Sequence, residues 1–110
     1  MIQETIAKIE SKIQKVGTLK EENKAELLNL LAELKTEITK LAKTHSEDAL
    51  SITGFTDVSA HEATRQEINP QLLELSLEGL SSSVKGFEAT HPRLVEIVNS
   101  ISLMLSNSGV

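Results

Sequence analysis

The sequence predicts an all-α protein: an antiparallel helical bundle of two hairpins with a partly helical middle insertion. First, apolar residues recur at steps of three and four through most of the 110 residues, a spacing that places them on one helix face. Second, residues 19–43 contain neither glycine nor proline and consist mainly of good helix formers. Third, no alternating run of β-branched residues is bounded by turn residues, so no strand is predicted. We expect one helical domain over residues 1–110.

Residues 1–45 are predicted to form an N-terminal helical hairpin. The first helix carries a narrow apolar seam at steps of four and three, made of Ile2, Ile6, Ile9, Ile13 and Val16. Gly17 tolerates the left-handed conformation that ends many helices, and Thr18 with Glu21 forms a capping-box pattern for the next helix. A tight turn at residues 17–18 is therefore expected.

The second helix of this hairpin is predicted from Leu19 to about Lys43. Its seam continues the same rhythm through Leu27, Leu31, Leu34, Ile38, Leu41 and His45. Leu28 belongs to a flatter stripe beside this seam, with Ala25 and Ala32. Because this helix is longer than the first, something else must cover the rest of its seam.

Residues 46–69 are predicted to be a variable middle segment. Ser46 and the two acidic residues after it resemble a capped helix start. Gly54, Asp57 and Ser59 then interrupt the apolar pattern. We expect a short helix, a break, and a second short helix over residues 61–66.

Residues 70–110 are predicted to form a C-terminal helical pair. Asn69 is a good N-cap, and Pro70 suits the first helical position. The seam of the first helix of the pair consists of Leu73, Leu77, Leu80, Val84 and Phe87. A stripe of small residues runs beside it, consisting of Ser76, Gly79, Ser83, Gly86 and Thr90. A glycine inside a helix costs about 1 kcal/mol relative to alanine, so the stripe indicates either the close approach of another backbone or a bend at the glycines.

The last helix is expected to begin at Pro92, and the His91-Pro92 boundary permits either a second hairpin or a sharp kink. Its apolar face consists of Leu94, Ile97, Val98, Ile101, Met104 and Leu105. No charged residue occurs from Ile97 to Val110. Since a solvated helix face usually carries charges, this helix is expected to be covered on more than one side, inside the bundle or at a subunit contact.

The uncharged tail and the unequal helix lengths favour a partner surface. A homodimer is the simplest arrangement, because a symmetric contact satisfies both copies at once. The candidate interface residues are Leu28, Gly79, Ser83, Gly86, Ile97, Ile101 and Met104. The leading prediction is a non-enzymatic helical module, without cofactors, that self-associates and binds another, unidentified protein.

The composition argues against several function classes. The chain has no cysteine, which excludes a disulfide framework, a thiolate metal site and thiol chemistry. Its 16 acidic residues against 11 basic ones give a net charge of −5, whereas a protein that binds nucleic-acid phosphates needs a basic face. No stretch reaches the roughly 20 apolar residues that cross a bilayer, and the N-terminus lacks a secretory h-region, so a cytoplasmic location is expected.

One pattern suggests metal chemistry. Glu88 and His91 form an E-x-x-H motif, which carboxylate-bridged di-iron bundles use twice. The alternative function is therefore a carboxylate/His metal-binding bundle with redox or hydrolytic activity, in which a dimer supplies the second motif. The simpler interpretation is a solvated Glu88 and a His91 that caps the helix boundary. Asp57, His61 and Arg65 lie at steps of four, and Glu62 precedes Arg65 by three. If this stretch is helical, these residues favour a charge ladder over an acid–base site, since no nucleophile or second histidine accompanies them.

The C-terminal half carries three distinctive segments: Gly86-Phe87-Glu88-Ala89, Thr90-His91-Pro92-Arg93-Leu94 and the ending Leu105-Ser106-Asn107-Ser108-Gly109-Val110. In these motifs the chain resembles domain-of-unknown-function (DUF) family 4404, small helical proteins of bacteria. Its ending differs from the Met-Gly-Ile expected in that family. Shorter members join the N-terminal and C-terminal helices with little between, which implies that residues 46 to about 65 elaborate a four-helix core. The family has no assigned activity, cofactor or catalytic residue, so the resemblance implies a bacterial cytosolic setting and no particular function.

Overall fold

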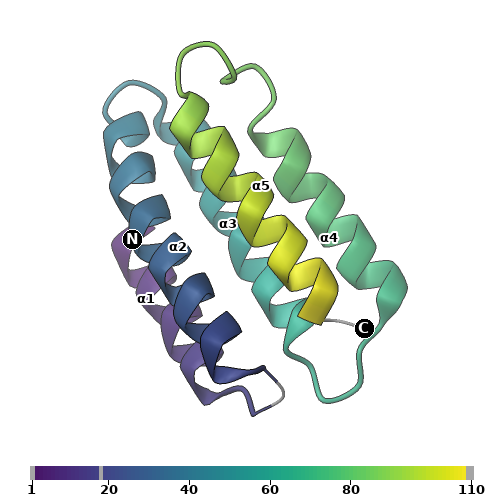
Figure 1. Cartoon of the computed structure of the whole chain (residues 1–110). Helices are drawn as coiled ribbons and strands as arrows, with labels where there is room; N and C mark the ends of the chain where they lie inside the picture. The colour runs from purple at the N-terminus through teal and green to yellow at the C-terminus, as the bar shows by residue number, and fades with distance from the viewer. Residues whose placement is uncertain (1, 18, 109–110) are drawn as a thin grey trace.

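The computed structural model describes residues 2–17 and 19–108, which form five α-helices and no strand (Figure 1). The helices are α1 (Ile2–Lys15), α2 (Glu21–Ala42), α3 (Ser46–Ala63), α4 (Pro70–Ser83) and α5 (Pro92–Ser108). Successive helices run in opposite directions along the bundle (Figure 1). The all-α prediction is confirmed.

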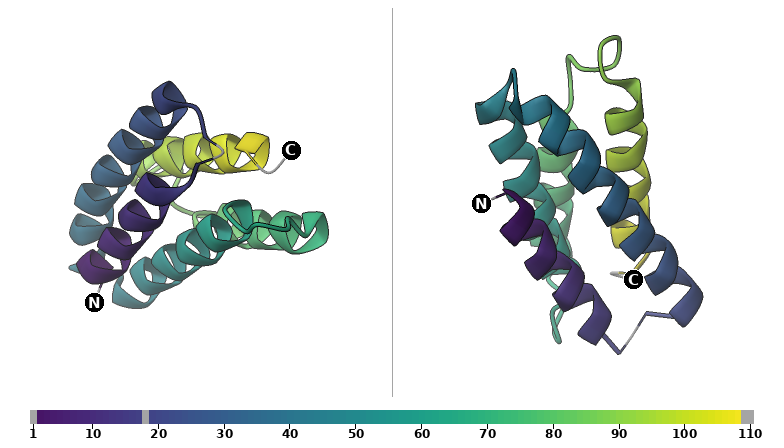
Figure 2. Two further views of the ribbon diagram at one scale, coloured as in Figure 1. Left: turned by 90° about the horizontal axis from the view of Figure 1, so that it is seen from below. Right: turned by 90° about the vertical axis from the view of Figure 1, so that its left-hand side faces the viewer.

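The third helix, α3, has more helix neighbours than any other helix of the described residues. It contacts each of the other four helices. Within the described residues, by contrast, α1 contacts α2 and α3 only, and α4 contacts α3 and α5 only. Seen from below in Figure 2, α1 and α2 lie at one side of the molecule and α4 at the other. The N-terminal and C-terminal helix pairs are therefore joined through α3, together with a contact between α2 and α5.

The break expected in the middle segment is wrong, because Ser46–Ala63 is one continuous helix that passes through Gly54. Gly54 lies on the exposed face, and a Cβ placed there would meet no heavy atom within 4 Å. The middle segment is thus part of the core, to which it contributes Ala49, Ile52, Ala60 and Ala63.

The buried face of α3 explains why the pattern was interrupted. Its buried hydrophobic and small polar residues are Ala49, Ile52, Thr53, Thr56, Ser59, Ala60 and Ala63. The hydroxyls of Thr53 and Thr56 each donate to the carbonyl oxygen one turn earlier, at 2.8 Å. A threonine satisfied in this way can be buried in a helix, and its small side chain lets neighbouring helices approach closely.

Replacing Gly54 by alanine is expected to raise the free energy of unfolding by about 1 kcal/mol, because alanine loses less backbone entropy in a helix. The new methyl group meets open space, so no contact opposes the gain. Urea denaturation measured by circular dichroism tests this. A destabilised variant would contradict a continuous helix at this position.

The fourth helix is shorter than predicted. α4 ends at Ser83, and residues 84–91 connect it to α5. Gly86 in this connection has a φ of +97°, in the left-handed region that favours glycine. Gly86, Phe87 and Thr90 therefore lie outside any helix, and within the small-residue stripe only Gly79 is a helical glycine.

The second helix also differs at its ends. α2 begins at Glu21, with Lys20 as its N-cap and no capping side chain, two residues later than predicted. Thr18, the other half of the expected capping box, lies outside the described residues. His45 follows α2 and is the N-cap of α3. The excess length of α2 is covered by α3 and α5, which it contacts in addition to α1.

The buried core consists of leucine, isoleucine, valine and alanine. Its members are Ile6, Ile9, Ile13, Leu27, Leu31, Leu34, Ile38, Leu41, Ala49, Ile52, Ala60, Ala63, Leu73, Leu80, Val84, Leu94, Ile97, Val98, Ile101 and Leu105. Across residues 2–17 and 19–108, no helix has the length and apolar character needed to span a membrane.

Candidate interaction surfaces

Two of the predicted interface residues belong to the core. Ile97 and Ile101 on α5 are each 1% exposed, and α5 contacts α2, α3 and α4. The apolar face of the uncharged helix is therefore covered inside the bundle, the first of the two arrangements expected from the sequence, while its outer face stays exposed. The assignment of these isoleucines to an interface is corrected to the core.

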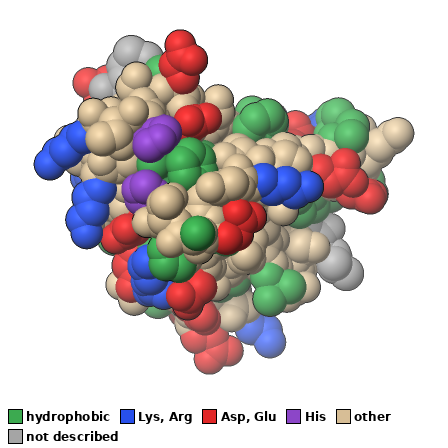
Figure 3. All heavy atoms as spheres, turned by 90° about the horizontal axis from the view of Figure 1, so that it is seen from above, with side chains coloured by type: hydrophobic (Ala, Val, Ile, Leu, Met, Phe, Trp, Pro, Cys, Tyr) green, Lys and Arg blue, Asp and Glu red, His purple; other side chains and the backbone are tan. Residues whose placement is uncertain are grey.

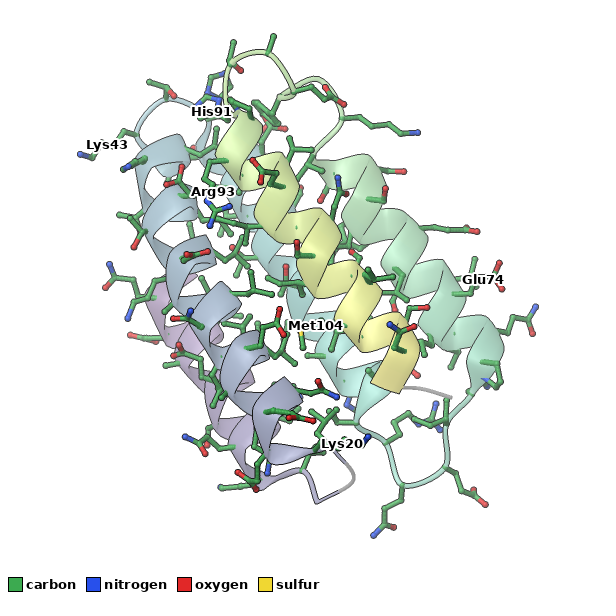
Figure 4. The ribbon with its side chains drawn as sticks, in the orientation of Figure 1. Lys20, Lys43, Glu74, His91, Arg93 and Met104 are labelled. Carbon is green, nitrogen blue, oxygen red and sulfur yellow. The ribbon has the colours of Figure 1, made fainter. Side chains whose placement is uncertain are left out.

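Four other predicted interface residues come from separate parts of the chain. Leu28 on α2 and Met104 on α5 are half-buried and pack against the core; Figure 4 labels Met104. The Ser83 hydroxyl donates to the Leu80 carbonyl oxygen at 2.6 Å, and Gly86 is exposed in the α4–α5 connection. They do not share one helix face.

Gly79, the remaining candidate, is covered by the ring of Phe55 from α3. A Cβ added at Gly79 would overlap Phe55 Cε1 and would lie 2.5 Å from Cδ1, well inside the carbon–carbon contact distance of about 3.5–4.0 Å. The close approach suggested by the small-residue stripe therefore exists at Gly79. It is made by an aromatic side chain of the same chain, where the sequence had suggested another backbone.

Phe55 is the first member of an exposed apolar patch along α3 and α4. Because the two helices run in opposite directions, Val58 lies beside the turn of α4 that precedes Gly79. That turn carries Leu75, and Leu72 lies nearly one turn further back. The four side chains are 40% to 56% exposed. We call Phe55, Val58, Leu72 and Leu75 the α3–α4 patch.

Large exposed apolar side chains are confined to the three C-terminal helices within the described part of the chain. They are Leu50, Phe55, Val58, Leu72, Leu75 and Leu103. The net negative charge is concentrated in the same part of the chain. Residues 46–110 contain three Lys or Arg against nine Asp or Glu, whereas residues 1–45 contain eight against seven. The N-terminal hairpin thus has a mixed-charge surface, and the other three helices present an acidic and partly apolar one.

A groove of about 710 Å³ runs between the outer faces of α4 and α5. Its lining residues are Pro70, Leu73, Glu74, Leu77, Glu78 and Ser81 on α4, and Asn99, Ser102, Leu103 and Ser106 on α5. We call this the α4–α5 groove. Leu103 is 64% exposed, the most exposed of the large apolar side chains described. Glu74 projects from α4 (Figure 4).

Two histidines meet at the end of the bundle formed by the α2–α3 and α4–α5 connections. The ring of Phe87 contacts His45 and His91 edge-on, at centroid distances of 5.5 and 5.6 Å, and the two imidazoles are 6.3 Å apart. Each imidazole Nδ1 lies within hydrogen-bond distance of the preceding threonine hydroxyl, 2.8 Å for Thr44 and 3.0 Å for Thr90. Two histidine side chains lie near one another on this end in Figure 3. These ring contacts link the α2–α3 connection to the α4–α5 connection.

Both residues of the E-x-x-H motif lie in the α4–α5 connection. Glu88 Oε1 accepts a hydrogen bond from the Gly86 amide at 2.8 Å, and Glu88 and His91 both lie outside any helix. The described residues contain no group of three or more His, Cys, Asp or Glu that could hold a metal ion. The contacts of the two residues are local: Glu88 accepts from its own turn, and His91 packs against Phe87.

Of the charge ladder predicted over residues 57–65, the structure forms the step from Glu62 to Arg65. Arg65 lies beyond the end of α3 and pairs with Glu62 at 3.0 Å. Glu62, itself 8% exposed, also lies 3.9 Å from His61 Nε2. A largely buried carboxylate needs such a partner, so the pair stabilises the C-terminal end of α3.

An ion pair connects the two sides of the bundle. Arg93 on α5, labelled in Figure 4, contacts Glu33 on α2 at 2.7 Å and Glu96 at 3.4 Å. These side chains are 41% to 72% exposed, and such pairs contribute at most about 1 kcal/mol. The α2–α5 contact is therefore held mainly by apolar packing.

The residues of the two surfaces were largely missed by the seam analysis. Leu72 and Leu75 lie off the seam that begins at Leu73, and Leu103 lies off the apolar face of α5. The signal that could have identified them is a leucine at a position where the helical period predicts solvent.

Comparisons with protein-family models, with curated proteins and with solved structures found no significant match to this chain. The resemblance to DUF family 4404 therefore stays a prediction from the sequence motifs.

Proposed function

We propose that this protein is a non-enzymatic helical module that pairs with a second copy of itself through the α3–α4 patch and also binds another protein. A cytoplasmic location, with neither nucleic acid nor membrane as ligand, belongs to the same proposal. The observation that carries it is the confinement of large exposed apolar side chains to α3, α4 and α5 within the described residues. Contiguous apolar surface is more typical of interaction sites than isolated exposed side chains are.

The composition of the α3–α4 patch suits self-association. It combines one aromatic ring with three aliphatic side chains, and aromatic residues are enriched in the cores of protein interfaces. None of its four side chains is charged. Two copies of the patch can therefore face each other across a two-fold axis without burying a charged side chain of the patch itself.

Glutamate substitutions in the patch test this. Val58 and Leu75 are 48% and 56% exposed, so a glutamate can stay in water in the monomer but would become a buried charge in the dimer. We expect the unmodified protein to have twice its chain mass of 12.0 kDa in size-exclusion chromatography with light scattering. Val58→Glu and Leu75→Glu should each weaken the dimer at least about 30-fold.

Leu50→Glu is the matched control. Leu50 is on the same helix and as exposed as Val58, at 48%, but it lies on the other flank of α3 from Phe55. We expect this variant to dimerise like the unmodified protein. A monomer at every concentration, or equal weakening by Leu50→Glu, would contradict the proposed interface.

A further inference from the structure

We infer that the α4–α5 groove binds an amphipathic helix of a partner protein, one with an apolar stripe and with Lys or Arg along a single flank. The inference names the chemistry of the other protein in the proposed function. It does not depend on self-association, because the groove and the α3–α4 patch lie on different flanks of α4. The two can therefore fail separately.

The shape of the groove fits a helix. Its α4 wall extends from Pro70 to Ser81, three turns or about 16 Å at 1.5 Å per residue. The half-buried Leu77, with the largely buried Leu73 beside it, supplies apolar surface on this wall, and the exposed Leu103 supplies it on the other. A third helix laid between two packed helices inserts side chains at i, i+3, i+4 and i+7 into such a groove.

Small side chains allow a close approach along both walls. Ser81 lies on α4, and Ser102 and Ser106 lie on α5. The Ser102 hydroxyl oxygen is buried and has no hydrogen-bond partner among residues 2–17 and 19–108. Because the Ser102 hydroxyl makes no hydrogen bond there, we attribute the serine at this position of the α5 wall to its small size.

The charges of the groove orient its occupant. Glu74 and Glu78 lie one turn apart on the same side of α4, where like charges repel one another. Neither carboxylate has a hydrogen-bond or ion-pair partner among the described side chains. The polar residues of the α5 wall, Asn99, Ser102 and Ser106, are neutral. A bound helix would thus meet two carboxylates along one flank and neutral groups along the other.

A second copy of this chain fits the groove less well. Eight of its lysines lie in residues 1–45, but the apolar seams of α1 and α2 are buried in the core. The helices with exposed apolar side chains, α3 to α5, belong to the acidic part of the chain. No described helix combines an exposed apolar stripe with a basic flank, so the complementary helix must come from another protein.

Synthetic peptides test the inference. The probe is a fluorescein-labelled helical peptide of about 16 residues, four to five turns, with leucines on one stripe and lysines on one flank. One control peptide replaces the lysines by glutamate, and another replaces the leucines by serine. Fluorescence anisotropy at low salt should show saturable binding of the lysine peptide. We expect at least about tenfold weaker binding of either control, and weaker binding of the lysine peptide as salt rises.

Variants of the protein locate the site. Leu103→Glu should weaken binding of the lysine peptide at least about tenfold, while Leu50→Glu should leave the affinity for this peptide unchanged. Glu74→Lys with Glu78→Lys should reverse the preference, so that the glutamate peptide binds better than the lysine peptide. Since all four residues are exposed, circular dichroism should show every variant folded.

Three results would overturn the inference. The first is equal affinity for lysine and glutamate peptides, and the second is an unchanged preference in the Glu74→Lys, Glu78→Lys variant. The third is absence of saturable binding together with loss of the dimer in Leu103→Glu, which would assign the groove to a second copy. Loss of the dimer in Val58→Glu without an effect on the peptide would leave the inference standing.

Discussion

Replacing Ile52 by alanine is expected to lower the free energy of unfolding by about 3 kcal/mol. Ile52 is fully buried on α3, the helix that contacts all four others. Truncation removes apolar contacts and leaves a cavity that surrounding helices fill only in part, and such changes cost about 2–5 kcal/mol. Urea denaturation followed by circular dichroism measures the loss.

Leu50→Ala is the control for this experiment, since Leu50 lies two residues earlier on the same helix and is 48% exposed. It should cost less than about 1 kcal/mol, as expected for a largely exposed site. An equally small loss for Ile52→Ala would show that residues 46–63 are peripheral to the core.

The effect of Gly79→Ala on the free energy of unfolding is expected to change sign when the residue at position 55 is changed. In the unmodified protein the new methyl group collides with the Phe55 ring. The resulting shift of the ring should lower the free energy of unfolding by about 1 kcal/mol. In a Phe55→Ala background the collision is absent. There the better helix propensity of alanine at position 79 should raise the free energy of unfolding by about 1 kcal/mol. The coupling between the two positions is therefore about 2 kcal/mol.

Denaturation of the four proteins in this double-mutant cycle measures that coupling. Additive effects would show that Phe55 does not rest on Gly79. The pairing matters for function because Phe55 belongs to the α3–α4 patch. The same variants should therefore also be compared for dimer formation.

The N-terminal hairpin was predictable because its helices follow simple rules. The isoleucines of α1 and the leucines of α2 repeat at steps of three and four, and each helix has one buried face and one charged face. The exact start of α2 was missed because Lys20, a residue without a capping side chain, occupies the N-cap position. Local capping preferences are weaker than the packing that fixes the helix.

The central helix was not predictable from the same rules. Because α3 contacts four helices, its buried face is wider than one narrow seam and includes Thr53, Thr56 and Ser59. A pattern search that expects one narrow apolar seam finds an interruption there. Which small polar residues are buried depends on the neighbouring helices, and those contacts are distant in sequence.

The interaction surfaces were predictable only in part. The small-residue stripe correctly indicated a close approach at Gly79, but the sequence could not show that Phe55 fills that space. Ile97 and Ile101 looked available for an interface because the number of covering helices was underestimated. Once α3 is counted as a full helix, their burial follows, and Leu103 emerges as the exposed leucine of α5.

Native-state hydrogen exchange of α3 amides tests the central position of this helix. The amides of Thr53, Thr56 and Ala60 should exchange only through global unfolding, with the same free energy as those of Leu34 and Ile38 in the core of α2. Exchange of residues 46–63 at a much lower free energy, while α2 and α5 stay protected, would contradict the packing on which both proposed surfaces depend.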